Sequence, residues 1–477
     1  MTNTTKATEL HAAAQEQGWA PLHVLLIGTF MIVLDAFIVN VALPSIQLDL
    51  SASTASLEWV VAGYGMAFAA FLIAGGRVGD RIGRRCAFTA GLVVFVLASA
   101  ICSLAPNSAT LVAARFGQGI GAALISPNVL SIMSVLYSGP KRVQALAAYG
   151  MVMGLAGAGG QVLGGLLIAA NLAGLSWRAI FLINLPIGLL GLILAQTNIP
   201  ESRSHQARHL DPVGMLLVTV ALLAIVVPLI EGNRLGWPAW TWLSFLLAAL
   251  LLSAVPPYVR RQERALRTPI FPSIVFGNHH LAVGLITQLT FWCTQASFFL
   301  VLALYLQDGR GLKPIAAGLV FSILAVTFFI ASMSAPRLAT RLGRDVILFG
   351  ALCVAAGDCL LWLFVRDFGA GGPLLLLAPG LALVGAGQGL AIPALIASVI
   401  SHSTPEYAGE VSGSLSTMTQ VGNALGVAIT GLVFTTSLAS GYAQAFGASL
   451  VQLIALLFFI ALLTRLLPTP KRQAAVS

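Results

Sequence analysis

The chain has 477 residues, of which 58% are hydrophobic and only 9% are charged, and its mean hydropathy is +0.93. Soluble proteins carry roughly 25% charged residues, so this composition excludes a set of soluble domains, and its hydrophobicity excludes a disordered chain. The apolar runs last about 20 residues, whereas barrel strands would alternate over about 10. The sequence therefore predicts an all-α polytopic membrane protein.

The apolar runs predict fourteen transmembrane helices, and this even number places both termini on the same side of the membrane. The predicted spans lie near residues 22–43, 57–75, 87–105, 109–136, 143–168, 177–197, 211–230, 239–257, 279–302, 314–334, 346–365, 373–398, 409–434 and 446–468.

The formal net charge of +9 could suggest a nucleic-acid partner, but the cations are spread over short loops and form no single basic face. One alternate set of loops holds most of them, and the opposite loops hold only Arg234, Arg310, Lys313 and Arg366. The positive-inside rule therefore predicts that both termini are cytoplasmic. The polar segment 1–21 has no apolar region with a cleavage site, so the first span is expected to start membrane insertion. The five cysteines lie within or beside apolar runs without a CxxC pair, so neither a disulfide framework nor a metal site is predicted.

An internal repeat is visible in three short segments that recur in the same order. Residues 76–84, 117–119 and 160–164 are echoed by 336–344, 387–389 and 422–426. Duplicated six-helix bundles are a transporter architecture with a binding site near the membrane midplane between the halves. The predicted organisation is a tail (1–21), a six-helix bundle (22–197), linkers with a two-helix insert (198–278), a second six-helix bundle (279–468) and a second tail (469–477).

The segment GGRVGDRIGRR (75–85) joins the second and third predicted spans on the cytoplasmic side. Gly76 and Gly83 allow a tight turn and close helix approach. Asp80 can pair with an arginine such as Arg81 or Arg84, or lie at a helix N-terminus. The segment is expected to act as a conformational switch that latches the two halves in the outward-facing state. The simpler interpretation is a basic loop that only sets topology.

This segment resembles the signature loop of the major facilitator superfamily. LDAFIVNVALP (34–44), LVAARFGQGIGAA (111–123) and SWRAIFLINLPIG (176–188) resemble span motifs of its fourteen-helix drug/proton antiporter branch. YLQDGRGLKPIAAG (305–318) and PEYAGEVSG (405–413) resemble second-half markers of the same branch. The resemblance implies a multidrug efflux transporter of the cytoplasmic (inner) membrane that exchanges protons for substrates, contributes to antibiotic resistance, and needs no cofactor.

Two positions depart from the family pattern. The antiporter motif of the fifth span usually contains a proline, and here it reads Gly160, Gln161, Gly164 and Gly165, with glutamine at the proline position. The glycines still permit bending and close packing, so antiport remains the expectation. In the second half, the position equivalent to Asp80 is occupied by Thr340, which is not acidic.

Ionisable groups at membrane depth are functional candidates, because an unpaired charge in hydrocarbon is costly. Asp35 is expected to bind and release the proton and to meet cationic substrate. Arg115, at the family's proton-coupling position, is expected to tune Asp35 or another carboxylate. Asp358 lacks a motif, so a local hydrogen-bonded role and a functional role stay open. Glu58, beside Trp59, is expected to be an interfacial anchor, with a binding group as the alternative.

A substrate cavity between the halves is the expected binding site. Its candidate residues are Asn40, Gln118, Trp292, Tyr305 and Asp358. A cavity for aromatic cations could be lined by Trp292, Tyr305 and the further residues Phe298, Phe299, Met418 and Phe434, which could equally be lipid-facing or packing residues. His279 and His280 are expected to be a solvated interfacial pair.

The sequence contains no nucleotide-binding loop, so an ion gradient or the substrate's own gradient must supply the energy. The expected protein is not an enzyme. It is a monomeric proton-coupled exporter of small amphipathic or cationic compounds, embedded in the lipid bilayer and working by alternating access. The alternatives are a dedicated exporter of one endogenous metabolite and, from a different class, a non-transporting membrane sensor.

Overall fold

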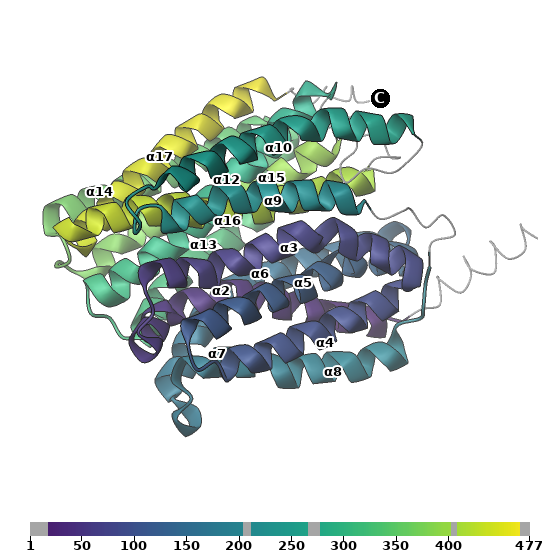
Figure 1. Ribbon diagram of the computed structural model, residues 1–477, viewed down its shortest axis with the longest axis horizontal. Coiled ribbons are helices and arrows are strands. Elements are labelled where there is room, and N and C mark those ends of the chain that lie inside the picture. Colours follow the sequence, from purple (N-terminus) through teal and green to yellow (C-terminus); the bar gives the residue numbers. More distant parts are fainter. Residues whose placement is uncertain (1–17, 204–210, 266–276, 402–407, 468–477) are drawn as a thin grey trace, which may run out of the picture.

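The computed structural model describes residues 18–203, 211–265, 277–401 and 408–467, and nearly all of them are helical (Figure 1). Both predicted tails lie largely outside these residues, as do 405–407 of the second-half marker at 405–413.

The first half contains the helices that the first six apolar runs predict. They are α2 (Ala20–Leu50), α3 (Thr54–Ile82), α4 (Arg84–Ser103), α5 (Ser108–Leu136), α6 (Gly139–Ala170), and the pair α7 (Ala179–Leu182) and α8 (Asn184–Asn198). The sixth span is divided between α7 and α8, but the stretch 176–198 is still long and apolar enough to cross a membrane.

The insert and the second half follow in the predicted order. The insert consists of α9 (Pro212–Glu231) and α10 (Ala239–Arg264), and the second half of α12 (His279–Leu304), α13 (Pro314–Leu342), α14 (Asp345–Phe368), α15 (Ala378–Ser401), α16 (Ala408–Ser437) and α17 (Tyr442–Leu466). A short π-helix, η3 (Tyr305–Gly309), extends α12.

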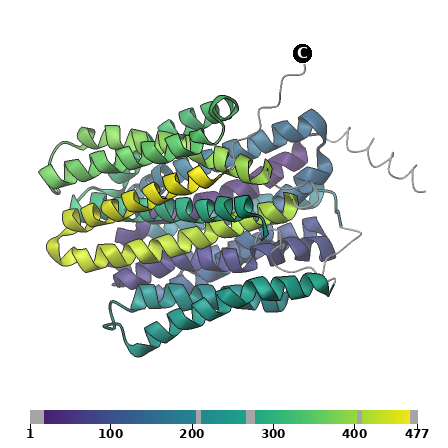
Figure 2. The same ribbon diagram turned by 90° about the horizontal axis from the view of Figure 1, so that it is seen from above.

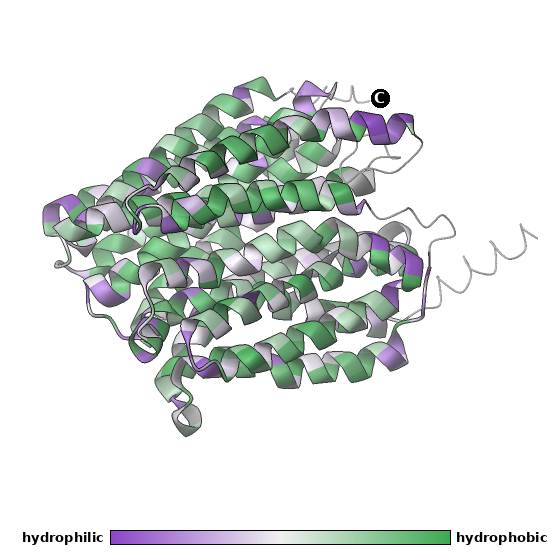
Figure 3. Ribbon diagram, viewed as in Figure 1, coloured by the Kyte–Doolittle hydropathy of each residue, from purple (hydrophilic) through white to green (hydrophobic). Residues whose placement is uncertain are grey.

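The number of spans agrees with the prediction. Among the described residues, thirteen helices are long and apolar enough to cross a membrane, and a fourteenth is gained when the bent pair Ala148–Gly157 and Gly159–Ala170 of α6 counts as one span. Hydrophobic residues cover the length of the helices, and hydrophilic ones gather toward the two ends of the bundle (Figure 3). The prediction of an all-helical protein with fourteen spans is confirmed.

Local sequence signals set several helix boundaries. Ser53 caps α3, because its hydroxyl accepts a hydrogen bond from the N–H of Ser56 at 3.2 Å. Asn107 caps α5 in the same way, through the N–H of Thr110 at 2.9 Å. Gly83 separates α3 from α4 with φ of +117°, a conformation that glycine adopts without the strain a side chain would cause.

The segment 75–85 differs from its predicted form. We expected a loop after a span ending near residue 75, but α3 remains helical to Ile82 and the turn is confined to Gly83. No proline interrupts α3, and hydropathy marks the apolar part of a helix and not its end. The motif is therefore mostly the last two turns of α3.

The helices run along a common direction, and the chain alternates between the two ends of the bundle (Figure 1). We call the end at which α2 begins and α17 finishes the termini end, and the other the opposite end. The two-helix insert lies along one side of the bundle, where α9 packs against α3 and α16 (Figure 2). The insert therefore contacts both halves.

The repeat in the sequence is also a repeat of contacts. In the first half, a Cβ at Gly119 would overlap the backbone oxygen of Tyr64, so α5 lies directly on α3. In the second half, a Cβ at Gly389 would overlap the backbone oxygen of Phe328, so α15 lies on α13 in the same way. The echoed glycines therefore mark equivalent close contacts.

A second pair of glycines relates the first and fifth helices of each half. A Cβ at Gly160 of α6 would meet the carbonyl oxygen of Leu34 on α2, and a Cβ at Gly422 of α16 would meet that of Leu289 on α12. This correspondence aligns α2 with α12 and shows which residues occupy equivalent places in the two halves.

The two halves are in contact near the opposite end. The Gln307 amide donates a hydrogen bond to the backbone oxygen of Val41 at 3.0 Å, and both groups are buried. The rings of Phe37 on α2 and Phe299 on α12 meet edge to face at 5.4 Å. Helices α6 and α13 also pack closely against each other. The two halves therefore meet at this end of the bundle.

Candidate functional site

The site is centred on the carboxylate of Asp35, which is fully buried in the middle of α2. Arg115 on α5 forms an ion pair with one carboxylate oxygen. The other oxygen accepts hydrogen bonds from the side-chain amides of Gln118 at 2.9 Å and Asn184 at 2.7 Å. Three donors from two helices, α5 and α8, therefore hold the carboxylate of a third. This arrangement offsets the cost of burying the negative charge.

A second layer of polar groups fixes the two amides. The hydroxyl of Ser99 on α4 accepts from Gln118 at 2.8 Å and from Asn184 at 3.3 Å. The thiol of Cys102 donates to the Gln118 carbonyl at 3.3 Å. The Asn184 carbonyl is buried and has no hydrogen-bond partner among the described residues. The network thus contains one free acceptor close to the carboxylate.

Arg115 has further partners that do not depend on Asp35. Its Nε donates to the backbone oxygen of Val60 at 2.8 Å, and its Nη1 also donates to the Gln118 carbonyl at 2.9 Å. The guanidinium lies 4.5 Å from the ring centre of Tyr64 and 5.9 Å from that of Phe181. Cation–π contacts of this kind are stronger when they are desolvated. The arginine therefore remains partly compensated when Asp35 is neutral.

All members of this network belong to the first half. The helices that surround Asp35 are α2, α4, α5 and α8, and α4 and α8 are packed within that half. In the second half, Thr290 occupies the place equivalent to Asp35, by the alignment of α2 with α12. Gly385 occupies the place of Arg115 at the repeat offset. The ion pair therefore has no symmetric copy.

Gln118 was predicted to line the substrate cavity. In this conformation its amide is fully buried and bonded within the Asp35 network. Asn184 and Ser99 also belong to this network, although neither was predicted from the sequence as a site residue. The available signal for Asn184 was a polar amide inside the apolar segment 176–188, while Ser99 is too common a residue in membrane helices to stand out.

The residues of segment 75–85 meet within the first half. Asp80 accepts hydrogen bonds from Arg84 Nε at 3.2 Å and Nη2 at 2.9 Å, so the acidic residue pairs with an arginine across Gly83. Arg81 is exposed, and Gly76 lies beside Pro127 of α5, with 3.4 Å between its Cβ position and the proline Cβ. The partner of Asp80 is therefore supplied by the motif itself.

Glu201, which was not predicted from the sequence as a site residue, closes this turn. Its carboxylate accepts hydrogen bonds from the backbone N–H groups of Arg85 at 3.1 Å and Cys86 at 3.2 Å. These are two of the unpaired N–H groups at the start of α4, where a negative charge is favourable. A Cβ at Gly83 would lie 2.5 Å from the same carboxylate. The end of the sixth span is thus bound to the start of the third.

Glycines of the antiporter-motif helix α6 lie against α2. A Cβ at Gly160 would be 3.3 Å from the backbone nitrogen of Ile38, and one at Gly164 would be 2.8 Å from the Ile38 side chain. Residues larger than glycine at these positions would push α6 away from α2, the helix that carries Asp35.

The other face of α6 meets the second half. A Cβ at Gly165 would lie 2.6 Å from the Pro314 carbonyl oxygen of α13, and one at Gly318 would lie 2.8 Å from the Gln161 carbonyl oxygen. The Gln161 side chain is buried, and neither of its polar atoms has a hydrogen-bond partner among the described residues. An amide in that situation can bind a polar group at little desolvation cost.

The remaining cavity candidates do not form one cluster. Asn40 donates to the Phe37 carbonyl at 3.1 Å, and its own carbonyl has no partner among the described residues. The N–H of the half-buried Trp292 indole likewise finds no acceptor within the described ranges. Tyr305 is fully buried in the second half, where its hydroxyl donates to the Gly369 carbonyl at 2.7 Å. Asp358 is buried in α14, and one of its carboxyl oxygens has no hydrogen-bond partner in the part of the chain that the structure describes.

Glu58 was expected to be an interfacial anchor, and this expectation is wrong. Its side chain is only 3% exposed, because it lies against Gly431 of α16 in the second half. Trp59, the next residue of α3, faces a surface pocket instead.

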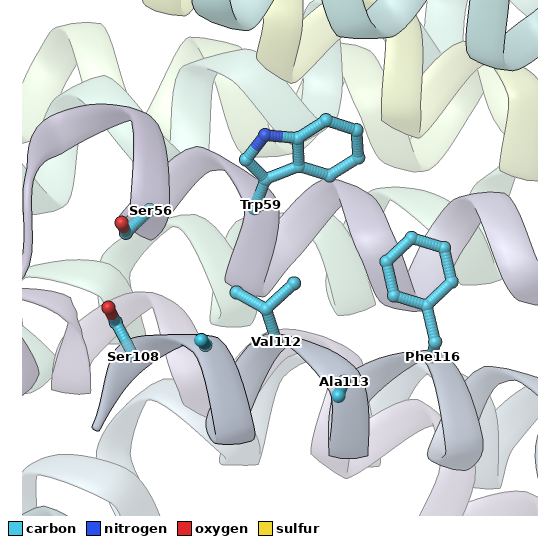
Figure 4. Close-up of a pocket in the computed structure, with 7 residues that line it drawn as sticks. Ser56, Trp59, Ser108, Val112, Ala113 and Phe116 are labelled. Atoms are coloured by element: carbon cyan, nitrogen blue, oxygen red, sulfur yellow. The ribbon is translucent and has the colours of Figure 1, made fainter.

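That pocket has a volume of about 600 Å³ and lies between α3 and α5 (Figure 4). Ser56, Trp59, Ser108, Ala109, Val112, Ala113 and Phe116 line it. None of these is a member of the Asp35 network, so the pocket and the buried ion pair are separate features.

The repeated six-helix halves, the buried ion pair and the membrane-spanning helices define a polytopic membrane transporter rather than an enzyme. The sequence model of the Major Facilitator Superfamily matches residues 25–427, with a second match at 284–476. The chain belongs to this family.

Three proteins of similar sequence support the family assignment. The chain is 34% identical over 417 residues to a "Probable actinorhodin transporter" of Streptomyces coelicolor, a match that covers 87% of this chain and 72% of the relative. It is 31% identical over 440 residues to the "Methylenomycin A resistance protein" of Bacillus subtilis, covering 91% of each chain. It is 32% identical over 415 residues to the "Multidrug resistance protein Stp" of Mycobacterium tuberculosis, covering 87% of this chain and 75% of that protein.

Solved structures share the fold at low sequence identity. An auto-inhibited POT family peptide transporter superposes with a TM-score of 0.70 at 15% identity, covering 95% of this chain and 98% of that one. A D-xylose-proton symporter superposes with a TM-score of 0.65 at 16% identity, covering 95% and 99%. These similarities establish the architecture.

Proposed function

We propose that the protein exports small amphipathic or cationic compounds across the cytoplasmic (inner) membrane in exchange for protons, by alternating access. The observation that carries this proposal is the buried pair of Asp35 and Arg115. An ionisable pair at membrane depth is expensive, and proton relays are a main use of such groups in transporters. The names of relatives, which refer to antibiotic resistance and transport, are compatible with this direction of transport.

The network can hold Asp35 in either protonation state. As a carboxylate, Asp35 is bound by Arg115, Gln118 and Asn184. As a neutral acid, it would become a donor and could use the unpaired carbonyl of Asn184 after a rotation of that amide. Arg115 would keep its bonds to Val60 and Gln118. Uptake of a proton therefore releases one ion pair and leaves Arg115 partly compensated by neutral acceptors.

Breaking that ion pair would loosen the contact between α2 and α5. Both helices belong to the half that must reorient against its partner in alternating access. We assign the segment with Gly76, Asp80, Arg81, Gly83 and Arg84 the role of a conformational switch at the termini end. Its Asp80–Arg84 pair and the Glu201 cap hold three helix ends together. Movement of the halves would act on this junction.

The positive-inside rule predicts that the termini end lies in the cytoplasm, and cysteine labelling tests this orientation. In a functional cysteine-free protein, a cysteine at Arg203 should react with a membrane-impermeant reagent in inside-out vesicles only. A cysteine at Ala370 should react in intact cells. Both positions are exposed, at the two ends of the bundle. Labelling with the reverse pattern at both positions would show that the orientation is inverted.

The transport activity is tested in proteoliposomes that contain the purified protein and a pH-sensitive dye. An imposed proton gradient should drive ethidium movement in the opposite direction, and a protonophore should abolish it. The same protein is then tested against a panel of compounds in cells that lack their own drug pumps. Ethidium transport that persists unchanged in the presence of the protonophore would refute proton coupling.

A dedicated exporter of one metabolite is the second candidate, because some relatives carry the name of a single compound, such as actinorhodin. The compound panel distinguishes the two: several unrelated compounds are exported in the first case and one in the second. A membrane sensor would export none of them. We further propose that the protein works as a monomer.

A further inference from the structure

The carboxyl group of Glu58 lies at the contact between the two halves. Glu58 is in the second turn of α3, close to the opposite end, and is only 3% exposed. A Cβ at Gly431 of α16 would lie 2.5 Å from the Glu58 carboxyl carbon and 2.9 Å from Oε2. The absence of a side chain at Gly431 therefore makes the room that the carboxyl group occupies.

The charged groups around Glu58 do not compensate it. The charged group that interacts with Glu58 is Glu231 on α9, and its charge is also negative. Glu231 already accepts two hydrogen bonds from Arg234, at 3.0 and 2.7 Å, and one from Trp59 at 3.3 Å. Among the described residues, Glu58 forms no ion pair with any cation.

The other helices packed against α3 offer no counter-charge either. The stretch 411–437 of α16 contains no charged residue. Arg115 of α5 is engaged with Asp35 of α2. Arg178 pairs with Asp49 near the end of α2, and α4 carries its arginines at the termini end. Glu58 differs in this from Asp35, which has an arginine and two amides.

Burial of this kind links protonation to conformation. Removing a carboxylate from water without a counter-charge costs several kcal/mol, whereas the neutral acid costs much less. In the closed contact, the neutral form of Glu58 is therefore the stable one. When α3 and α16 separate at the opposite end, water can reach the group and stabilise the carboxylate. Proton binding and closure then favour each other, as linkage requires.

We propose that Glu58 is a second proton-binding group, which sets the balance between the closed and open forms of the opposite end. This proposal rests on the alternating access of the proposed function. Glu58 lies four residues from the start of α3, a distance of about 6 Å along the helix axis. It exchanges its proton with the opposite side of the membrane and carries no proton across. Acid on that side closes the contact, and the carboxylate opens it.

Distances between spin labels across the opposite end test the proposal in the full-length, cysteine-free protein in nanodiscs. Leu48 on α2 and Leu375 of the second half are suitable label positions, because they are 83% and 81% exposed. In the wild-type background, the short-distance population should grow as the pH falls. One coupled proton changes the closed-to-open ratio by up to about tenfold per pH unit. In Glu58→Gln, the short-distance population should dominate at every pH.

Two further variants define the result. Asp367→Asn removes an exposed carboxylate at the same end, which is paired with Arg366, and should keep the wild-type pH response. Glu58→Asp should restore a pH response that Glu58→Gln lacks. A wild-type protein without a pH response, or a Glu58→Gln protein that retains the full response, overturns the proposal.

The test separates this inference from the proposed function. In Asp35→Asn, proton-driven transport should be lost, while the Glu58-dependent change in distance should persist. A normal pH response without any proton-coupled transport in the wild-type protein would refute the exporter and leave Glu58 in place. Normal transport with a pH response that is independent of Glu58 would refute the role of Glu58 and leave the proposed exporter in place.

Discussion

Replacing Asp35 with asparagine should abolish the exchange of protons for substrate. Asparagine keeps the size of the side chain and one acceptor oxygen but cannot take up or release a proton. The measurement is substrate-induced proton release from the purified protein in detergent and in proteoliposomes. Asp49→Asn is the matched control, because Asp49 is also paired with an arginine, Arg178, but is much more exposed. It should leave exchange close to the wild-type rate.

The same change should also lower stability, because Arg115 loses its counter-ion. Breaking one partner of a buried pair costs about 3 kcal/mol, reduced here by the bonds of Arg115 to Val60 and Gln118. A double variant, Asp35→Asn with Arg115→Met, removes both charges and should regain thermal stability without regaining exchange. If Asp35→Asn exchanges protons at the wild-type rate, Asp35 is structural, and Asp358 must be considered as the carrier.

The second large effect is expected from valine at Gly119 or at Gly389. At both positions even a Cβ would overlap a backbone oxygen of the neighbouring helix, which cannot move aside as a flexible side chain could. Overpacking of this severity costs about 3 kcal/mol or more. Each variant should therefore lose most of its folded protein, measured as the monodisperse fraction after detergent extraction.

Gly150→Val is the control for both variants. Gly150 is a helical glycine with no heavy atom within 4 Å of its Cβ position. It should keep near-normal amounts of monodisperse protein. Wild-type amounts of Gly119→Val or Gly389→Val would show that α3–α5 and α13–α15 are not packed as closely as the repeat of contacts indicates.

The fold could be predicted from the sequence to a large extent, because lipid imposes simple rules. Runs of about 20 apolar residues must be helices, and each predicted span overlaps a helical stretch. The echo of 117–119 in 387–389 also identified contacts that are physically equivalent. The end of α3 was misplaced because a helix continues beyond the apolar region until a residue such as Gly83 stops it.

The site could be predicted only in part. Asp35 and Arg115 were recognisable because ionisable groups in apolar spans are rare, whereas the direction in which each side chain points depends on packing. From the sequence, Gln118 was therefore predicted to line a cavity, although its side chain is hydrogen-bonded to Asp35. It placed Glu58 at an interface with water, because a position near a helix end does not reveal that Gly431 covers it.

The one-sided placement of the ion pair has a pharmacological consequence. Asp35 is surrounded by helices of a single half, and two of them, α4 and α8, pack within that half. We propose that the transported compound binds where the halves face each other; an inhibitor lodged there would compete with it but leave the ionisable pair untouched. A molecule that wedges among α2, α4 and α8 would act in a non-competitive manner. Resistance mutations against the two kinds of inhibitor would then arise in different parts of the chain.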